Sequence, residues 1–234
     1  GSTVPQAKFV AKQASGLANA NMRLTGFHPL RLGTHNGSSG ELPGAWRQHG
    51  DIPIIRPSRG PAVTTADPVL ILRDHDNLHC AWVRGLGASQ EFSSLGCITV
   101  HGSFDTAKRT HLDPYEGAGW ATFRARAGVT PTAYPKGAVA ATETRPGYGT
   151  VYQTLLLTGR EARLAAIGGE VPRRLRFGSQ GEAVRRLQEK LQAPAAERTG
   201  VFTAATVDRF TTWQRRELGW RDGIVRPGDI GVDF

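Results

Sequence analysis

One histidine and one cysteine have a spacing that suits chemistry. His79 precedes Cys97 by eighteen positions, and Ser94 and Gly96 stand directly before the thiol in Ser94-Leu95-Gly96-Cys97. A thiol is reactive as the thiolate, which a nearby imidazole favours by accepting the proton. Gly96 permits close backbone approach, and amide N–H groups aimed at one point can hold an oxyanion. The pattern predicts a cysteine-based acyl-transfer site with Cys97 as nucleophile and His79 as base.

The chain has a second cysteine, Cys80, next to the histidine. If His79 lies on a β-strand, Cys80 points to the opposite face of the sheet. The cysteine that serves His79 is then Cys97, and a disulfide between the two cysteines is disfavoured. The alternatives are a structural disulfide, or two buried thiols beside a histidine that is merely packed.

Acidic residues and further histidines raise the alternative of a metal centre. Asp74-His75-Asp76 comes just before His79. Other histidines are scattered along the chain: His28, His35, His49, His101 and His111. A zinc peptidase needs three such ligands around one open position. Because the spacing fits no metallopeptidase pattern, we expect no metal and no cofactor, and we interpret Asp74 and Asp76 as part of a solvated turn.

The elements that must position these residues change in character near residue 170. Before it, short apolar stretches alternate with Gly, Pro, Asn and Thr, which is typical of strands joined by loops. We predict strands at 69–72, 97–100 and 151–157, a loop at 33–44, a helical turn at 117–127, a helix at 161–167 and a hinge at 168–172. The catalytic pair therefore belongs to a mostly β region.

After the hinge the pattern becomes helical. Six apolar residues are predicted to form a core: Val184, Leu187, Leu191, Val201, Phe202 and Phe210. Ser179 or Gly178 is predicted to begin a first helix, and Glu182, three residues after Ser179, fits a capping box. Thr203 is predicted to cap a second helix.

This C-terminal part resembles the three-helix peptidoglycan-binding modules. The resemblance rests on residues 175–188, on Gly200-x-Phe202-x-x-x-Thr206, on Phe210 with Gln214, and on Asp222-Gly223-Ile224-Val225. It implies that this part binds peptidoglycan. The family continues with Gly-Pro and a last helix, whereas here Arg226-Pro227-Gly228 leads to a short tail. We therefore expect the last helix to be truncated or replaced.

The first part resembles the L,D-transpeptidases through His79 and the Ser94-x-Gly96-Cys97 motif. The resemblance implies that Cys97 attacks a peptide carbonyl of the wall stem, at the diamino acid that precedes a D-alanine. It implies that His79 takes the thiol proton and that the backbone amides around Leu95, Gly96 and Cys97 hold the oxyanion. The acyl-enzyme then passes to an amine, which forms a crosslink, or to water, which trims the peptide.

Three residues depart from that family pattern. Cys80 follows the histidine where the family often has Gly, and Leu95 replaces a His or Asn. Thr99 stands where an Arg commonly follows the nucleophile by two positions. Without that Arg, the sequence does not identify the residue that binds an anionic stem peptide. Hydrolysis in place of transfer is therefore an alternative outcome.

Taken together, the sequence predicts an α+β protein with two domains. Residues 1–168 are expected to form a mostly β, L,D-transpeptidase-like catalytic domain, and residues 171–234 a small three-helix peptidoglycan-binding domain. The alternatives are a wall-binding protein without catalysis and a zinc-dependent wall peptidase or amidase.

The charge distribution limits the partners. The net charge of +9 is spread out, with 12 basic against 8 acidic residues in 171–234 and 17 against 12 before it. No block of like charge predicts a nucleic-acid arm, and no apolar run is long enough to cross a bilayer. We expect a monomer that binds peptidoglycan in the cell envelope, periplasmic or secreted, without nucleic acid and without a membrane span.

Overall fold

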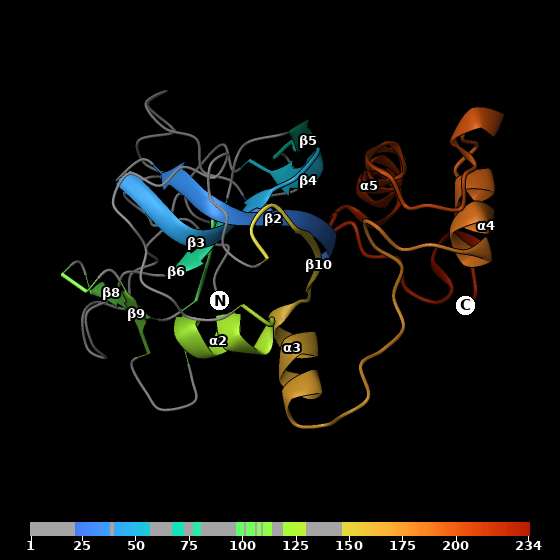
Figure 1. The fold of residues 1–234 in the computed structure, drawn as a ribbon. Coiled ribbons are helices and arrows are strands. Elements are labelled where there is room, and N and C mark those ends of the chain that lie inside the picture. Colours follow the sequence, from blue (N-terminus) through green and yellow to red (C-terminus); the bar gives the residue numbers. More distant parts are fainter. Residues whose placement is uncertain are drawn as a thin grey trace.

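The computed structural model describes residues 22–37, 40–56, 67–72, 77–80, 97–100, 102–105, 107–108, 110–113, 119–129 and 147–234. Within these ranges the protein is α+β, with three sheets and four α-helices (Figure 1). The sheets come from the first part of the chain, and helices α4 and α5 of the last part stand beside them.

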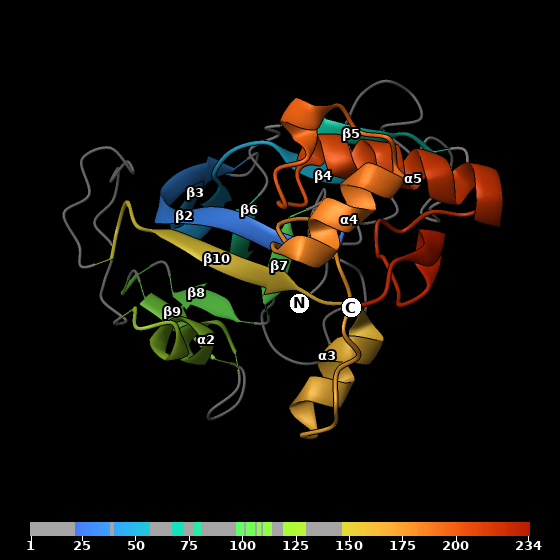
Figure 2. The ribbon, with the colours of Figure 1, turned by 90° about the vertical axis from the view of Figure 1, so that its right-hand side faces the viewer.

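The central element is a five-stranded sheet. Its strands, in spatial order, are β10 (Val151–Leu156), β2 (Gly26–Gly37), β3 (Gly40–Gln48), β6 (Asn77–Cys80) and β7 (Ile98–Val100). All neighbours are antiparallel except β6 and β7, which run parallel. Strand β10 forms one edge of the sheet (Figure 2). The parallel pair brings residues before and after the long 81–96 segment side by side.

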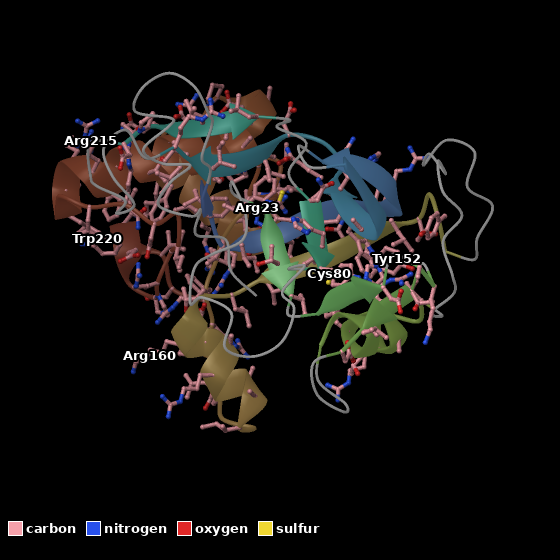
Figure 3. All side chains as sticks on the ribbon, turned by 90° about the vertical axis from the view of Figure 1, so that its left-hand side faces the viewer. Arg23, Cys80, Tyr152, Arg160, Arg215 and Trp220 are labelled. Atoms are coloured by element: carbon pink, nitrogen blue, oxygen red, sulfur yellow. The ribbon has the colours of Figure 1, made fainter. Side chains whose placement is uncertain are left out.

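One face of this sheet packs against helix α2 (Trp120–Arg126). The buried cluster on this face consists of Leu30, Leu32, Trp46, Leu78, Cys80, Ile98, Trp120 and Val129. The rings of Trp46 and Trp120 meet edge to face with centroids 5.5 Å apart, a favoured aromatic geometry. Figure 3 shows Cys80 and Tyr152 on this side of the sheet, and Tyr152 packs against the cluster. The opposite face is thereby left for the alternate residues of each strand.

Two smaller sheets complete the first part. Strands β1 (Met22–Arg23), β4 (Ile52–Ile55) and β5 (Val69–Leu72) form an antiparallel sheet, and β8 (Ser103–Asp105) pairs with β9 (Thr110–Leu112). The first of these sheets contacts α5.

The C-terminal part has its own helices. They are α4 (Glu182–Lys190), η1 (Ala195–Glu197), α5 (Ala204–Leu218) and η2 (Asp229–Gly231). Its core contains Val184, Leu187, Phe202 and Phe210, as predicted, while Leu191 packs at the margin and Val201 is half-buried. Leu24 and Ile55 of the first part are buried in the same core.

Helix α3 (Gly159–Ala166) connects the two parts of the chain. Thr158 and Glu161 form a capping box at its start. Glu161 also binds Arg176 through two hydrogen bonds, of 2.6 and 3.1 Å, and both side chains are buried. The segment between α3 and the C-terminal part is therefore fixed at both ends.

Most of the predicted elements are confirmed. Strand β5 has the expected bounds, β7 and β10 differ from theirs by one residue, and α2 and α3 lie where helices were expected. The predicted cap of α5 is also present, since the Thr203 side chain accepts a hydrogen bond from the Thr206 N–H. In the tail after Val225, where a truncated or replaced last helix was expected, the structure has the short η2.

Two predictions are wrong. Residues 33–37 and 40–44 are not a loop but belong to the paired strands β2 and β3, with a register shift between Gly33 and His35 and a positive φ of 59° at Gly44. Gly33 lies at the register shift, which is a β-bulge, and Gly44 adopts a backbone conformation that is strained for other residues. The predicted capping box of α4 is absent, since the N-cap is Gly181 and the Ser179 hydroxyl accepts from the Arg176 N–H at 3.0 Å.

No helix in the described ranges is both long and apolar enough to cross a membrane.

Candidate active site

The structure places His79 on strand β6 and Cys97 directly before β7, the parallel neighbour of β6. His79 lies in β6 opposite Thr99 of β7, and Cys97 comes two residues before Thr99. Alternation along the strands puts all three side chains on the sheet face opposite the α2 core. With ~3.3 Å per residue and ~4.8 Å between strands, the Cα atoms of His79 and Cys97 are ~8 Å apart. Ser94, Leu95 and Gly96 lie outside the described residues.

The sulfur of Cys97 has a backbone donor and a cation close to it. The Asn77 N–H donates to Cys97 Sγ at 3.2 Å, because Asn77 stands beside Cys97 one position before the β6–β7 ladder. Asn77 also pairs with Arg47 of β3, whose Nε donates to Asn77 Oδ1 at 3.2 Å. Arg47 of β3, Asn77 of β6 and Cys97, which directly precedes β7, thus form one row.

Charge couples the first and last members of this row. Burial lowers the pKa of Arg47 from its usual value, and the charge of Cys97 acts against this and raises it. Because such an interaction is mutual, the Arg47 guanidinium stabilises a thiolate at Cys97. Cys97 is partly exposed, so the thiol combines access with a positive environment, as reactive cysteines do.

His79 is held in a form that can act as a base. Its side chain is buried, and burial lowers the pKa of the imidazole below 6.5, partly offset by a hydrogen bond to the Cys80 carbonyl. This bond joins Nδ1 to the Cys80 oxygen over 2.6 Å. A carbonyl oxygen only accepts, so Nδ1 carries the proton and Nε2 has the free lone pair of a neutral imidazole.

The other cysteine has different surroundings. Cys80 is buried on the α2 side of the sheet, one residue from His79 and facing away from it. Neither Cys80 nor Cys97 forms a disulfide. Cys80 belongs to the cluster on the α2 side while its neighbour His79 alternates to the other face, so the prediction that the two point to opposite faces is confirmed. Cys97 is the cysteine that shares a face with His79.

Sequence reasoning missed Arg47 and Asn77. Neither stands near a recognisable motif, and both become visible only when β3, β6 and β7 are placed in register. Thr99 stands out in the sequence because an arginine is expected at its position. In the structure the guanidinium that interacts with Cys97 belongs to Arg47 of β3, two strands away from Thr99.

The described residues contain no group of three or more His, Cys, Asp or Glu side chains that could hold a metal ion. The predicted turn at Asp74-His75-Asp76 lies outside them. His28, one of the scattered histidines, is buried against Phe177 with ring centroids 5.5 Å apart. Burial and the charge of Arg23 lower the pKa of His28 to about 4, against the opposing effect of its hydrogen bond to Leu24. His28 is therefore a neutral packing residue.

In comparisons with protein-family models, curated proteins and solved structures, no match to this chain was found.

Proposed function

We propose that the protein is a cysteine-dependent enzyme that acts on the stem peptides of peptidoglycan, as an L,D-transpeptidase or as an L,D-carboxy- or endopeptidase. The observation that carries this proposal is the environment of Cys97. Its sulfur accepts a hydrogen bond from the Asn77 N–H and interacts with the positive charge of Arg47. Its side chain shares a sheet face with the neutral imidazole of His79.

The first half of the reaction follows from these groups. The Cys97 proton passes to Nε2 of His79, while Arg47 and the Asn77 N–H stabilise the thiolate. The sulfur attacks a peptide carbonyl carbon and forms a C–S bond. The C–N bond then breaks as the imidazolium returns its proton to the leaving amine. A hydrogen bond between Cys97 and His79 is expected to tighten when substrate binds, as is common in such sites.

The second half regenerates the thiol. An amine or a water molecule loses its proton to His79 and attacks the thioester carbonyl, and the C–S bond breaks as the proton returns to the sulfur. An amine gives a crosslink and water gives a trimmed stem. No cofactor is needed for either outcome.

Peptidoglycan as the substrate is supported by the C-terminal part. The residues that resemble a peptidoglycan-binding module form α4, α5 and the turns between them, and four of their apolar positions are buried as such a module requires. A tethered binding module raises the local concentration of substrate at the catalytic site. The proposed substrate implies a location in the cell envelope.

Mass spectrometry of purified muropeptides tests the proposal. The intact protein is incubated with tetrapeptide, pentapeptide and dimeric muropeptides, in parallel with Cys97→Ala and Cys80→Ala. We expect loss of D-alanine, cleavage at the diamino acid or a new crosslink with the intact protein and with Cys80→Ala, which keeps the backbone carbonyl that holds His79. We expect no product with Cys97→Ala. Equal product from both variants, or none from the folded intact protein, contradicts the proposal.

A further inference from the structure

A groove of about 700 Å³ lies between the central sheet and the C-terminal part. Strands β2 and β10 contribute Phe27 and Gln153, and the C-terminal part contributes Phe177, Gln180 and Thr203. Its two walls are joined directly, since the Phe27 N–H donates to the Phe177 carbonyl at 2.8 Å. The groove is therefore a fixed feature of how the two parts meet.

The lining suits a neutral ligand that has both apolar and polar surfaces. Phe27 and Phe177 offer aromatic surface, and Phe27 is 37% exposed although it is apolar. Amide and hydroxyl groups lie beside them, and among the described residues of the lining Asp51 is the one that is formally charged. A sugar ring has this character, with a C–H face that packs on an aromatic ring and a rim of hydroxyls that form hydrogen bonds.

The groove shares a sheet face with the candidate active site. Phe27 and Arg31 alternate onto the same face of β2. Arg31 pairs with Arg47, and Arg47 pairs with Asn77, which stands beside Cys97. Three interstrand spacings, ~14 Å, separate β2 from β7, and Pro29 at the near end of the groove lies two residues, ~7 Å, from Arg31. The groove therefore begins ~16 Å from Cys97. The row of side chains between groove and thiol carries two guanidinium groups.

We propose that this groove is a glycan subsite that holds the sugar backbone of peptidoglycan while its stem peptide crosses the sheet to Cys97. The inference rests on the proposed function. Three residues of extended peptide span ~10 Å, so a stem that starts at the near end of the groove, at Pro29, extends with the group that joins it to the sugar towards the sulfur of Cys97. The carboxylates of the stem then pass Arg31 and Arg47, whose charge is complementary.

Binding of sugar without peptide tests the subsite directly. Glycan strands freed of stem peptides, and chitotetraose as a defined probe, are titrated into the full chain with Cys97→Ala, by calorimetry. In that background Phe27→Ala is expected to weaken binding about tenfold, because it removes an aromatic anchor. Ala204→Trp is expected to fill the groove and abolish binding. Each variant is first checked for an unchanged melting temperature.

Leu155→Ala is the matched control. Leu155 lies directly opposite Phe27 on β10, is exposed to a similar degree, and does not line the groove. We expect its affinity for the glycan to be unchanged. Glycan binding that survives both Phe27→Ala and Ala204→Trp, or that Leu155→Ala weakens as much as Phe27→Ala does, overturns the inference.

A second measurement separates this inference from the proposed reaction. With the active protein, Phe27→Ala is expected to raise KM about tenfold for stems attached to glycan and to leave KM for free stem peptides unchanged. An equal effect on both substrates overturns the subsite although the chemistry stands. If no substrate is processed but glycan binding depends on the groove, the proposed reaction fails and the subsite stands.

Discussion

At the scale of single residues, the two cysteines show how environment decides reactivity. Cys97 is partly exposed and has a backbone N–H and a guanidinium near its sulfur. Cys80 is buried in an apolar cluster that includes Leu78 and Trp120. A thiolate is stabilised in the first environment and opposed in the second. The two residues are chemically identical. Their environments differ because strand alternation places Cys80 on one face of the sheet and Cys97 on the other.

Arg47 is expected to set the pH at which Cys97 becomes reactive. In a Cys80→Ala background, where Cys97 is the only thiol, Arg47→Met is expected to move the midpoint of the alkylation rate to higher pH by about one unit. The sign follows because loss of the cation destabilises the thiolate, so a higher pH is needed to form it. Iodoacetamide labelling followed by mass spectrometry across the pH range measures the midpoint.

Arg31→Met is the control for this prediction. Arg31 pairs with Arg47 on the same sheet face but lies one strand farther from Cys97. Its replacement is expected to leave the midpoint within a few tenths of a unit. Equal shifts for the two variants indicate a general field effect and contradict a specific role of Arg47.

At the scale of elements, sequence patterns identified strands better than their pairing. The apolar runs at 69–72 and 151–157 predict strands because their composition is local information. The paired strands over 33–37 and 40–44 are not predicted, because their glycines are typical of loops. What makes them strands is pairing on both sides, with β10 beside β2 and β6 beside β3, and these partners come from later in the chain.

The same limit applies to the candidate site. The sequence predicts His79 and Cys97 as a pair because their spacing resembles a known motif, and it predicts the opposite orientation of Cys80 from strand alternation. Arg47 and Asn77 were not recognisable, because their nearness to Cys97 depends on two strand registers. A sequence defines which side chains alternate, but only the register defines which of them meet.

The ion pair between α3 and the C-terminal part is expected to contribute strongly to stability. Hydrogen bonds from Arg176, more than the hydrogen bonds from Thr158, lower the pKa of Glu161 from 4.5 to about 2 against the effect of its burial. The lowered pKa corresponds to about 3 kcal/mol of folding stability, which is present above pH 4.5 and is lost as the pH falls towards 2. Glu161→Gln is expected to lower the free energy of unfolding at pH 7 by about 3 kcal/mol, because it leaves Arg176 buried without a counter-charge. Denaturant unfolding measures this.

An exposed pair of the same chemistry is the control. Arg209 and Glu197 form a salt bridge with both side chains about one-third exposed. Glu197→Gln is expected to change the unfolding midpoint little, because solvent screens such a pair. In addition, Glu161→Leu with Arg176→Met is expected to recover much of the loss caused by Glu161→Gln. A similar cost for Glu161→Gln and Glu197→Gln contradicts the role assigned to burial.

At the scale of the whole molecule, the two parts of the chain share a hydrophobic core. Leu24 and Ile55 of the first part are buried among the helices of the last part. A Cβ added at Gly223 would lie 3.0 Å from Leu24 Cδ1, which shows how closely Leu24 packs against that turn. A module that only tethers the protein to its substrate has no need of such packing. The shared core instead fixes the two walls of the groove.

This shared core is expected to make the protein unfold as one cooperative unit. Leu24→Ala removes a buried side chain and leaves a cavity, which costs about 2–5 kcal/mol. Leu24 belongs to the first part of the chain but contacts the last part. The variant is therefore expected to lower the melting temperature of both parts in a single calorimetric transition. It is also expected to speed hydrogen exchange in α4 and α5 as well as in β2. Leu218→Ala, at an exposed leucine of α5, is expected to change neither. Two separate transitions, of which Leu24→Ala shifts only one, contradict the shared core. They indicate that the last part is an independent module. Its position beside the sheet, and hence the groove, is then not fixed.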